Sequence, residues 1–152
     1  MNKLDNQRLI NHLNQLLSNH FILYVKLHRY HWYIQGRNFF RLHEYFEELY
    51  ERSSEFLDEV AERILMIGGK PLATMSMYLK QGTLEEANAD DTEEEIIAQL
   101  IRDFEQVASE IRETGLPLAE EYEDEPTTDI LIEQLSAFEK ELWMLRSYQN
   151  EK

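Results

Sequence analysis

The sequence of 152 residues contains no cysteine, only three prolines and only five glycines. Without cysteine the chain has no disulfide, no thiolate zinc site, no iron–sulfur cluster and no cysteine nucleophile, so any metal ligands must be histidine, aspartate or glutamate. The absence also fits a reducing, cytoplasmic setting. No run of 18 apolar residues occurs, and the start of the chain lacks the apolar segment of a signal peptide, so we expect neither membrane insertion nor export.

Basic residues are also scarce, with 15 lysines and arginines against 30 acidic residues and a net charge of -15. The imbalance is local: residues 85–129 contain 17 acidic residues and two arginines, whereas the rest of the chain has 13 of each sign. This pattern argues against general nucleic-acid binding and indicates cations as partners. A solvated face that keeps the protein soluble is the alternative interpretation.

Apolar residues alternate at spacings of four and three between residues 5 and 34, which predicts a first long helix. The members of this series are Leu9, Leu13, Leu16, Leu23, Leu27, Tyr30 and Ile34, with His20 in the remaining position. A second set lies on another side of the same helix and comprises Leu17, Phe21, Tyr24, His28, His31 and Trp32. A helix that is apolar over so wide an arc needs cover on more than one side, and a second subunit is one source of that cover.

Three further long helices are predicted. The second extends from Phe39 to Ile67 and ends at a Gly-Gly pair. The third follows a cap at Thr92 and is expected to stop at Gly115 and Pro117. The fourth follows Pro126. Residues 70–91 are too many for a direct turn, so we expect a short helix there. The prediction is an all-α chain forming one domain over residues 1–152. Its four-helix bundle, with one long connection between the second and third helices, has the connectivity of ferritin-like folds.

All five histidines lie in the first 43 residues, so the second half of the chain offers none. A di-iron site inside one bundle takes Glu-x-x-His motifs from two helices, usually one in each half, and cannot be built here. Asp58 and Glu62 share one face of the second helix, although such pairs are common on ordinary helices and a surface pair with Arg63 nearby is the better explanation when the pair is taken alone.

We then ask whether His31, His43, Asp58 and Glu62 could bind one iron. His43 and Asp58 are 15 residues apart on one helix, roughly 22 Å, so one chain cannot supply all four ligands. Two chains packed antiparallel could, and two-fold symmetry would make two equivalent sites. Such a ligand set suits iron and also zinc, manganese or cobalt.

Residues 24–79 closely resemble the Dps family of mini-ferritins. The similarity lies in the pair His31-Trp32, in Leu-His-Glu ending at Glu44, and in the D-x-x-A-E-R motif from Asp58 to Arg63. It implies a hollow dodecamer with ferroxidase centres at two-fold interfaces, made by His31 and His43 of one subunit and Asp58 and Glu62 of its neighbour. It also implies oxidation of Fe(II), typically with hydrogen peroxide and otherwise with dioxygen, and storage of ferric mineral inside the shell.

Several other residues gain meaning from this resemblance. Trp32 would pack the interface, with interception of stray oxidising equivalents as the alternative, and His28 would lie behind the ligands. One face of the second helix would be either a solvent face or a place where mineral nucleates, and its acids are Glu44, Glu47, Glu48, Glu51 and Glu55. An acidic pore is expected where three subunits meet, with candidates Glu120, Glu121, Asp124 and Asp129, of which the two aspartates are preferred. His20 is expected in the core, hydrogen-bonded, and the role of His12 stays open.

Two other functions compete with iron oxidation. Family members that coat DNA commonly use a tail rich in lysine and arginine, but here only Lys3 and Arg8 precede residue 26. Because phosphate binding scales with the number of cationic contacts, we expect no DNA binding. The third candidate is a structural helical oligomer without activity.

Overall fold

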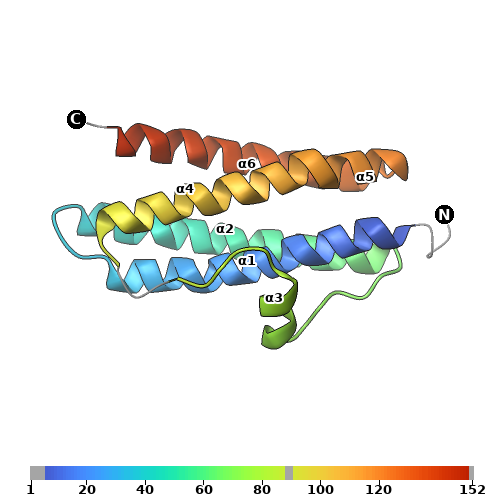
Figure 1. Cartoon of the computed structure of the whole chain (residues 1–152), viewed down its shortest axis with the longest axis horizontal. Helices are drawn as coiled ribbons and strands as arrows, with labels where there is room; N and C mark the ends of the chain where they lie inside the picture. Colours follow the sequence, from blue (N-terminus) through green and yellow to red (C-terminus); the bar gives the residue numbers. More distant parts are fainter. Residues whose placement is uncertain (1–5, 88–90, 151–152) are drawn as a thin grey trace.

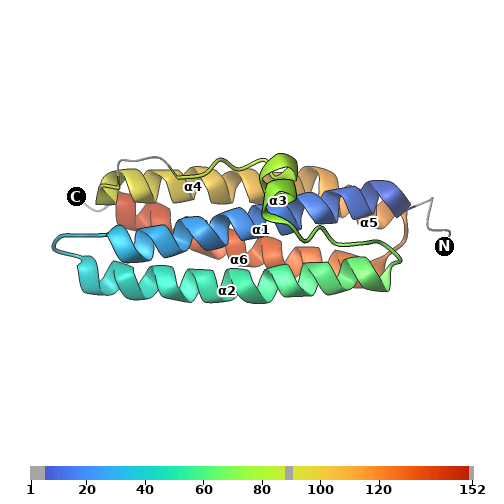
Figure 2. The same cartoon turned by 90° about the horizontal axis from the view of Figure 1, so that it is seen from below.

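Two antiparallel pairs of long helices make up the protein. The structure, a computed structural model, describes residues 6–87 and 91–150. Helix α1 (Gln7–Tyr33) packs along α2 (Phe39–Met66), and α4 (Glu93–Glu110) packs along α6 (Glu125–Gln149). The short helix α3 (Met75–Gln81) lies outside the bundle against α1, in the connection between α2 and α4 (Figures 1 and 2). Since the described residues contain no strand, the predicted all-α bundle is confirmed.

The core forms along the predicted apolar series of α1. All seven apolar members of that series are buried, and His20 between them has no exposed surface. Nε2 of His20 lies 2.8 Å from Oε1 of Gln134 on α6, so it donates to that oxygen. Burial lowers the pKa of His20 to about 4, and the ring is therefore neutral near pH 7. His20 is the hydrogen-bonded core residue that the sequence predicts.

The second apolar set of α1 is covered less completely. Phe21, Tyr24 and His28 are only half-buried, and Trp32 is 66% exposed. The bundle therefore covers one side of α1 and leaves part of the other side free, as the width of the apolar arc predicts.

The prediction that the third long helix stops at Gly115 and Pro117 is wrong. After α4 the chain makes a wide π-turn from Ile111 to Gly115 and continues as α5 (Leu116–Glu121). The N–H of Leu116 bonds to the carbonyl of Ile111, five residues back. The wide turn skips one position in the hydrogen-bond register, so Pro117 falls in the first turn of α5, where its missing N–H is tolerated.

Gly115 is required here by a close contact with α1. A Cβ atom at this position would lie 2.4 Å from Nε2 of His12, whose ring is buried. We therefore expect Gly115→Ala to destabilise the protein by about 1 to 3 kcal/mol, because the ring or the π-turn must shift. Urea denaturation at fixed protein concentration measures this loss.

The neighbouring exposed position offers the control, since Thr114→Ala should change stability little. A double-mutant cycle with His12→Ala identifies the cause. The smaller side chain removes the clash, so Gly115→Ala should cost much less in that background. An equal cost in both backgrounds would show that the His12 contact is not the reason for this glycine.

Candidate metal centre

His31 and His43 come together where the end of α1 meets the start of α2. Their rings are stacked, with centroids 3.7 Å apart and planes within 11°. Nδ1 of His31 lies 2.6 Å from the carbonyl oxygen of His43, and Nδ1 of His43 lies 2.7 Å from the carbonyl oxygen of His31. A carbonyl oxygen can only accept, so both Nδ1 atoms carry the hydrogen and donate. In this tautomer the lone pair of each imidazole lies on Nε2, which is the atom that would bind a metal ion.

This reciprocal pair of hydrogen bonds orients both imidazoles before any ligand arrives. His31 is 7% exposed, and His43 is half-buried. Oε1 of Glu47, one turn after His43 on α2, lies 3.8 Å from Nε2 of His31. The arrangement supplies two fixed nitrogen donors and a nearby carboxylate.

The other two predicted ligands are elsewhere. Asp58 and Glu62 are exposed on the later turns of α2, and neither carboxylate has an ion-pair partner among the described residues. In the part of the chain that the structure describes, no three His, Cys, Asp or Glu side chains lie close enough to hold a metal ion. One chain thus presents two separate halves of the predicted ligand set.

Arg63 does not pair with Asp58 or Glu62 in this chain, although the sequence offers that as an alternative. Its guanidinium instead bonds Asp124 at 2.8 Å and the hydroxyl of Thr127 at 2.9 Å. Arg63 therefore does not occupy the two exposed carboxylates, and a ligand from outside the chain can reach them.

Aromatic side chains surround the histidine pair. His28 donates from Nδ1 to the carbonyl of Tyr24 at 2.7 Å and stacks on Tyr50 at 3.7 Å. Tyr50 also meets the edge of His31. The sequence analysis did not single out Tyr50. Tyr50 follows His43 by seven residues, a spacing that places both side chains on the same face of α2 and would have identified Tyr50 as a neighbour of the histidines.

The acidic residues expected to nucleate mineral do share a surface of α2. Glu44, Glu48, Glu51 and Glu55 are exposed, and Glu47 is half-buried beside His31. Of the expected pore residues, Glu120, Glu121 and Asp129 are exposed around the junction of α5 and α6, and Glu121 pairs with Arg8 at 2.7 Å.

Asp124, one of the two preferred pore residues, lies inside the protein. It is 8% exposed, caps α6 through the backbone N–H of Thr127 at 3.1 Å, and accepts from the Thr127 hydroxyl and from Arg63. Burial alone would raise the pKa of Asp124, but the Thr127 bonds and the Arg63 charge outweigh it and hold this pKa below its ordinary value. Asp124 positions α6 against α2, and we remove it from the pore.

Replacing Asp124 tests this structural role. We expect Asp124→Ala to cost about 1 to 2 kcal/mol through the lost cap. Because the folded-state pKa is lowered, the contribution of Asp124 is present above its unfolded pKa and is lost as the pH falls through the lowered value. Denaturant midpoints measured from pH 7 downward should therefore converge for the two proteins in acid. Asp129→Ala, on the exposed surface of the same helix, is the control, and an equal loss in both variants would contradict the assignment.

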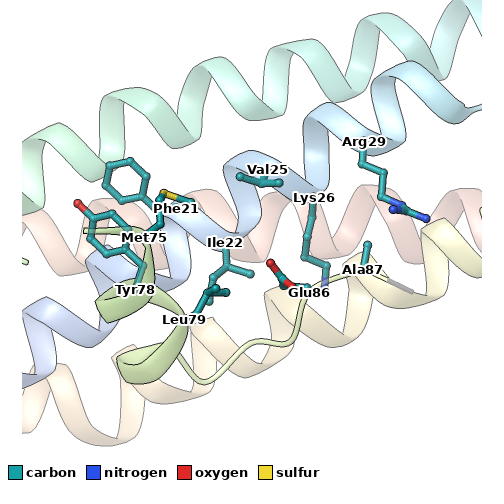
Figure 3. A pocket seen from close by; sticks show the side chains of 10 residues that line it. All are labelled: Phe21, Ile22, Val25, Lys26, Arg29, Met75, Tyr78, Leu79, Glu86 and Ala87. Carbon is teal, nitrogen blue, oxygen red and sulfur yellow. The ribbon is translucent and has the colours of Figure 1, made fainter. Parts of the chain in front are cut away.

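An apolar surface lies along α1 on the side that faces α3. A cavity of about 170 Å³ lies between α1, α3 and the segment after α3 (Figure 3). Phe21 and Tyr78 stack inside it at 4.1 Å, while Val25, Met75 and Leu79 on its rim are each about half exposed. Val25 and the exposed Trp32 both lie on α1 and belong to its free apolar side.

The all-α bundle, with its long connection between α2 and α4, defines a ferritin-like fold. Residues 10–151 match the family described as ferritin-like domain. The chain is 42% identical to DNA protection during starvation protein 2 of Bacillus anthracis, over 96% of this chain and 99% of that protein. These similarities place the chain in the Dps family of mini-ferritins.

Solved structures agree with this assignment. The crystal structure of Dps from Staphylococcus aureus superposes with a TM-score of 0.93 at 36% identity, covering 96% of this chain and 97% of that one. Dps of Vibrio cholerae O1, described as a member of a broad superfamily of ferritin-like diiron-carboxylate proteins, superposes with the same TM-score at 34% identity and covers 97% and 92% of the two chains. The family functions in iron storage and protection. No helix among the described residues is long and apolar enough to span a membrane.

Proposed function

We propose that this protein oxidises Fe(II), with hydrogen peroxide as the preferred oxidant and dioxygen as the other candidate, and stores the ferric product inside a hollow dodecamer. Removing Fe(II) and peroxide together would limit oxidative damage. The observation that supports the proposal is the pair His31 and His43, whose rings are held by reciprocal hydrogen bonds from Nδ1. Both Nε2 atoms are left to bind metal, yet the described part of the chain completes no metal site.

The proposed site combines two subunits. His31 and His43 of one subunit and Asp58 and Glu62 of its neighbour would bind the iron, with the free apolar side of α1 forming the contact. Imidazole nitrogens accept Fe(II), and the harder carboxylate oxygens favour the ferric product. Zinc would bind the same ligands without changing its oxidation state.

Acidic residues would attract Fe(II) at the pore before oxidation and nucleate the ferric mineral after it. Glu120, Glu121 and Asp129 are the proposed pore residues, because a ring of exposed carboxylates raises the local concentration of cations. Glu44, Glu47, Glu48 and Glu51 are the proposed nucleation residues on α2.

Native mass spectrometry together with light scattering, before and after addition of Fe(II) and peroxide, tests assembly and storage in one experiment. We expect a particle of twelve subunits that gains mass as ferric absorbance appears. A monomer would contradict the proposal. An assembled particle whose mass does not change would also contradict it and would favour a structural helical oligomer without activity.

We also expect the assembled protein not to bind DNA. The relative in Bacillus anthracis is named for DNA protection, but Lys3 and Arg8 are the only cationic side chains before residue 26, and Arg8 pairs with Glu121. A particle of strongly negative charge, with only two cationic side chains among the first 25 residues of each chain, should not hold phosphates at physiological salt. A gel shift of intact plasmid at low micromolar protein checks this, and retarded plasmid would prove the expectation wrong.

A further inference from the structure

His12 is buried without a hydrogen bond where the start of α1 meets the π-turn and α5, at one end of the bundle (Figures 1 and 2). The residue is 6% exposed, and neither Nδ1 nor Nε2 has a hydrogen-bond partner among residues 6–87 and 91–150. Buried polar side chains are normally bonded, and a missing bond destabilises the folded state. The contact between α1 and α5 is therefore weaker at His12 than an apolar contact would be.

The His12 ring lies between a tight contact and an open polar groove. Nε2 faces Gly115, where an added Cβ atom would lie 2.4 Å away. The groove beside the ring has a volume of about 570 Å³. Its walls are largely uncharged amide and hydroxyl groups, from Asn11, Asn14, Gln15, Gln81 and Thr114. A rotation of the His12 side chain would move the imidazole from the glycine to hydrogen-bond acceptors and water.

His20, the other buried histidine in the first half of α1, is held differently. Burial lowers the pKa of both His12 and His20 to about 4. His20, however, bonds Gln134 at 2.8 Å and packs between the rings of Phe56 and Phe138. His12 has neither such a bond nor such a ring contact among the described residues, and it lines a groove. His12 is thus the histidine that can take up a proton without disrupting the core.

The charges around His12 do not stabilise a protonated ring in its buried position. Among the described residues that line the groove, Arg8 is the other charged one, and it pairs with Glu121 on α5 at 2.7 Å. Arg112 of the π-turn pairs with Glu139. Further charged groups on the surrounding elements are exposed or bonded elsewhere, namely Lys70, Lys80, Glu110, Glu113 and Glu120. Burial is the cause of the lowered pKa of His12, and none of these carboxylates offsets it.

We infer that the contact between His12 and Gly115 is an acid-sensitive joint. When His12 gains a proton, its ring turns into the groove, and the π-turn and α5 loosen from α1. Water and the amide oxygens of the groove then bond to the charged imidazole, while the space beside Gly115 loses its filling. Because α5 carries Glu120 and Glu121, a consequence of this opening for iron movement rests on the proposed function.

The pKa of His12 sets the direction and the range of the effect. The pKa is about 4 in the closed joint and takes its ordinary value of 6.5 when the ring is in water. The neutral ring favours the closed joint, so the joint weakens as the pH falls from 6.5 toward 4 and weakens no further below that range. For one proton and these two pKa values, the equilibrium constant for opening rises about 20-fold between pH 7 and pH 5.

Hydrogen exchange measured by mass spectrometry on the assembled protein tests the joint. Opening constants for the backbone amides of residues 111–121 are obtained at pH 7, 6 and 5, after correction for the intrinsic pH dependence of exchange. His12→Phe keeps a ring against Gly115 that cannot take a proton, and His12→Leu is a second non-titrating variant without a ring. The control is Arg8→Gln, which removes the ion pair between α1 and α5 and keeps His12.

We expect the rise of about 20-fold in the parent and in Arg8→Gln, and a rise below about threefold in both His12 variants. No rise in the parent, a rise of full size in both His12 variants, or its loss in Arg8→Gln would overturn the joint. Iron-loaded parent should also release iron to a ferric chelator at pH 5 several-fold faster than His12→Phe. Equal release would overturn the consequence for iron movement, whereas a parent protein that loads no iron would overturn the proposed function and leave the exchange result standing.

Discussion

Replacing both His31 and His43 by alanine should reduce the rate of Fe(II) oxidation by about 100-fold or more, because the variant keeps the carboxylates but loses both nitrogen donors of each site. Even single partners that only orient a metal ligand are typically worth 10- to 100-fold, so loss of two ligands belongs at or beyond that limit. The measurement is ferric absorbance after mixing Fe(II) with peroxide, at equal concentrations of assembled protein.

The control for this loss is His12→Ala, which also removes a buried imidazole from α1. His12 lies 19 residues before His31, roughly 28 Å along the helix, so its loss should leave the oxidation rate near that of the parent. Native mass verifies that each variant still assembles. An undiminished rate in the assembled double variant would show that these histidines are not the site.

A second large effect is expected when two inactive variants are combined. One variant lacks His31 and His43, the other lacks Asp58 and Glu62, and each alone should be inactive. If every site takes histidines from one subunit and carboxylates from its neighbour, a mixed pair contains one complete site and one site without ligands. Random pairing makes about half of all pairs mixed, so unfolding and reassembling the two variants together should restore about a quarter of the parent rate.

Mixing the same two variants without unfolding is the control, since subunits that stay in their own assemblies should remain inactive. A site completed within one chain would predict no recovery under either condition. The size of the recovery therefore decides whether the four ligands belong to one subunit or to two.

Much of the fold could be predicted because apolar residues recur at helical spacing in the sequences of α1, α2, α4 and α6. The spacing of Leu9 to Ile34 identified the buried side of α1, including the unusual His20. The end of the third long helix could not be predicted in this way. Gly115 and Pro117 are local signals for a helix end, but the π-turn from Ile111 carries the helix past them. Gly115 also packs against His12, which is far away in the sequence, and spacing alone does not reveal that contact.

The composition of the candidate site and its proposed division between two subunits both come from the sequence. His43 and Asp58 are too far apart along one helix to bind the same ion, and the second half of the chain contains no histidine. The sequence did not indicate that His31 and His43 would bond to each other's carbonyl groups, or that Tyr50 would touch His31. These contacts depend on how α1 packs against α2, which residue spacing alone does not specify.

The charge of this protein depends on its sequence, but the pairing of its charges depends on its tertiary structure. The sequence by itself determined that the chain has no thiolate ligands, that its charge is -15, and that the acidic excess lies within residues 85–129. Only the tertiary structure decided which of those acids are neutralised, since bases from outside the segment pair with five of them, through Lys26–Asp103, Arg29–Asp91, Arg63–Asp124, Arg8–Glu121 and Arg146–Glu105. Net charge depends on composition, whereas the field that a cation meets depends on which charges lie within a few ångströms of each other, and that distance is decided by folding.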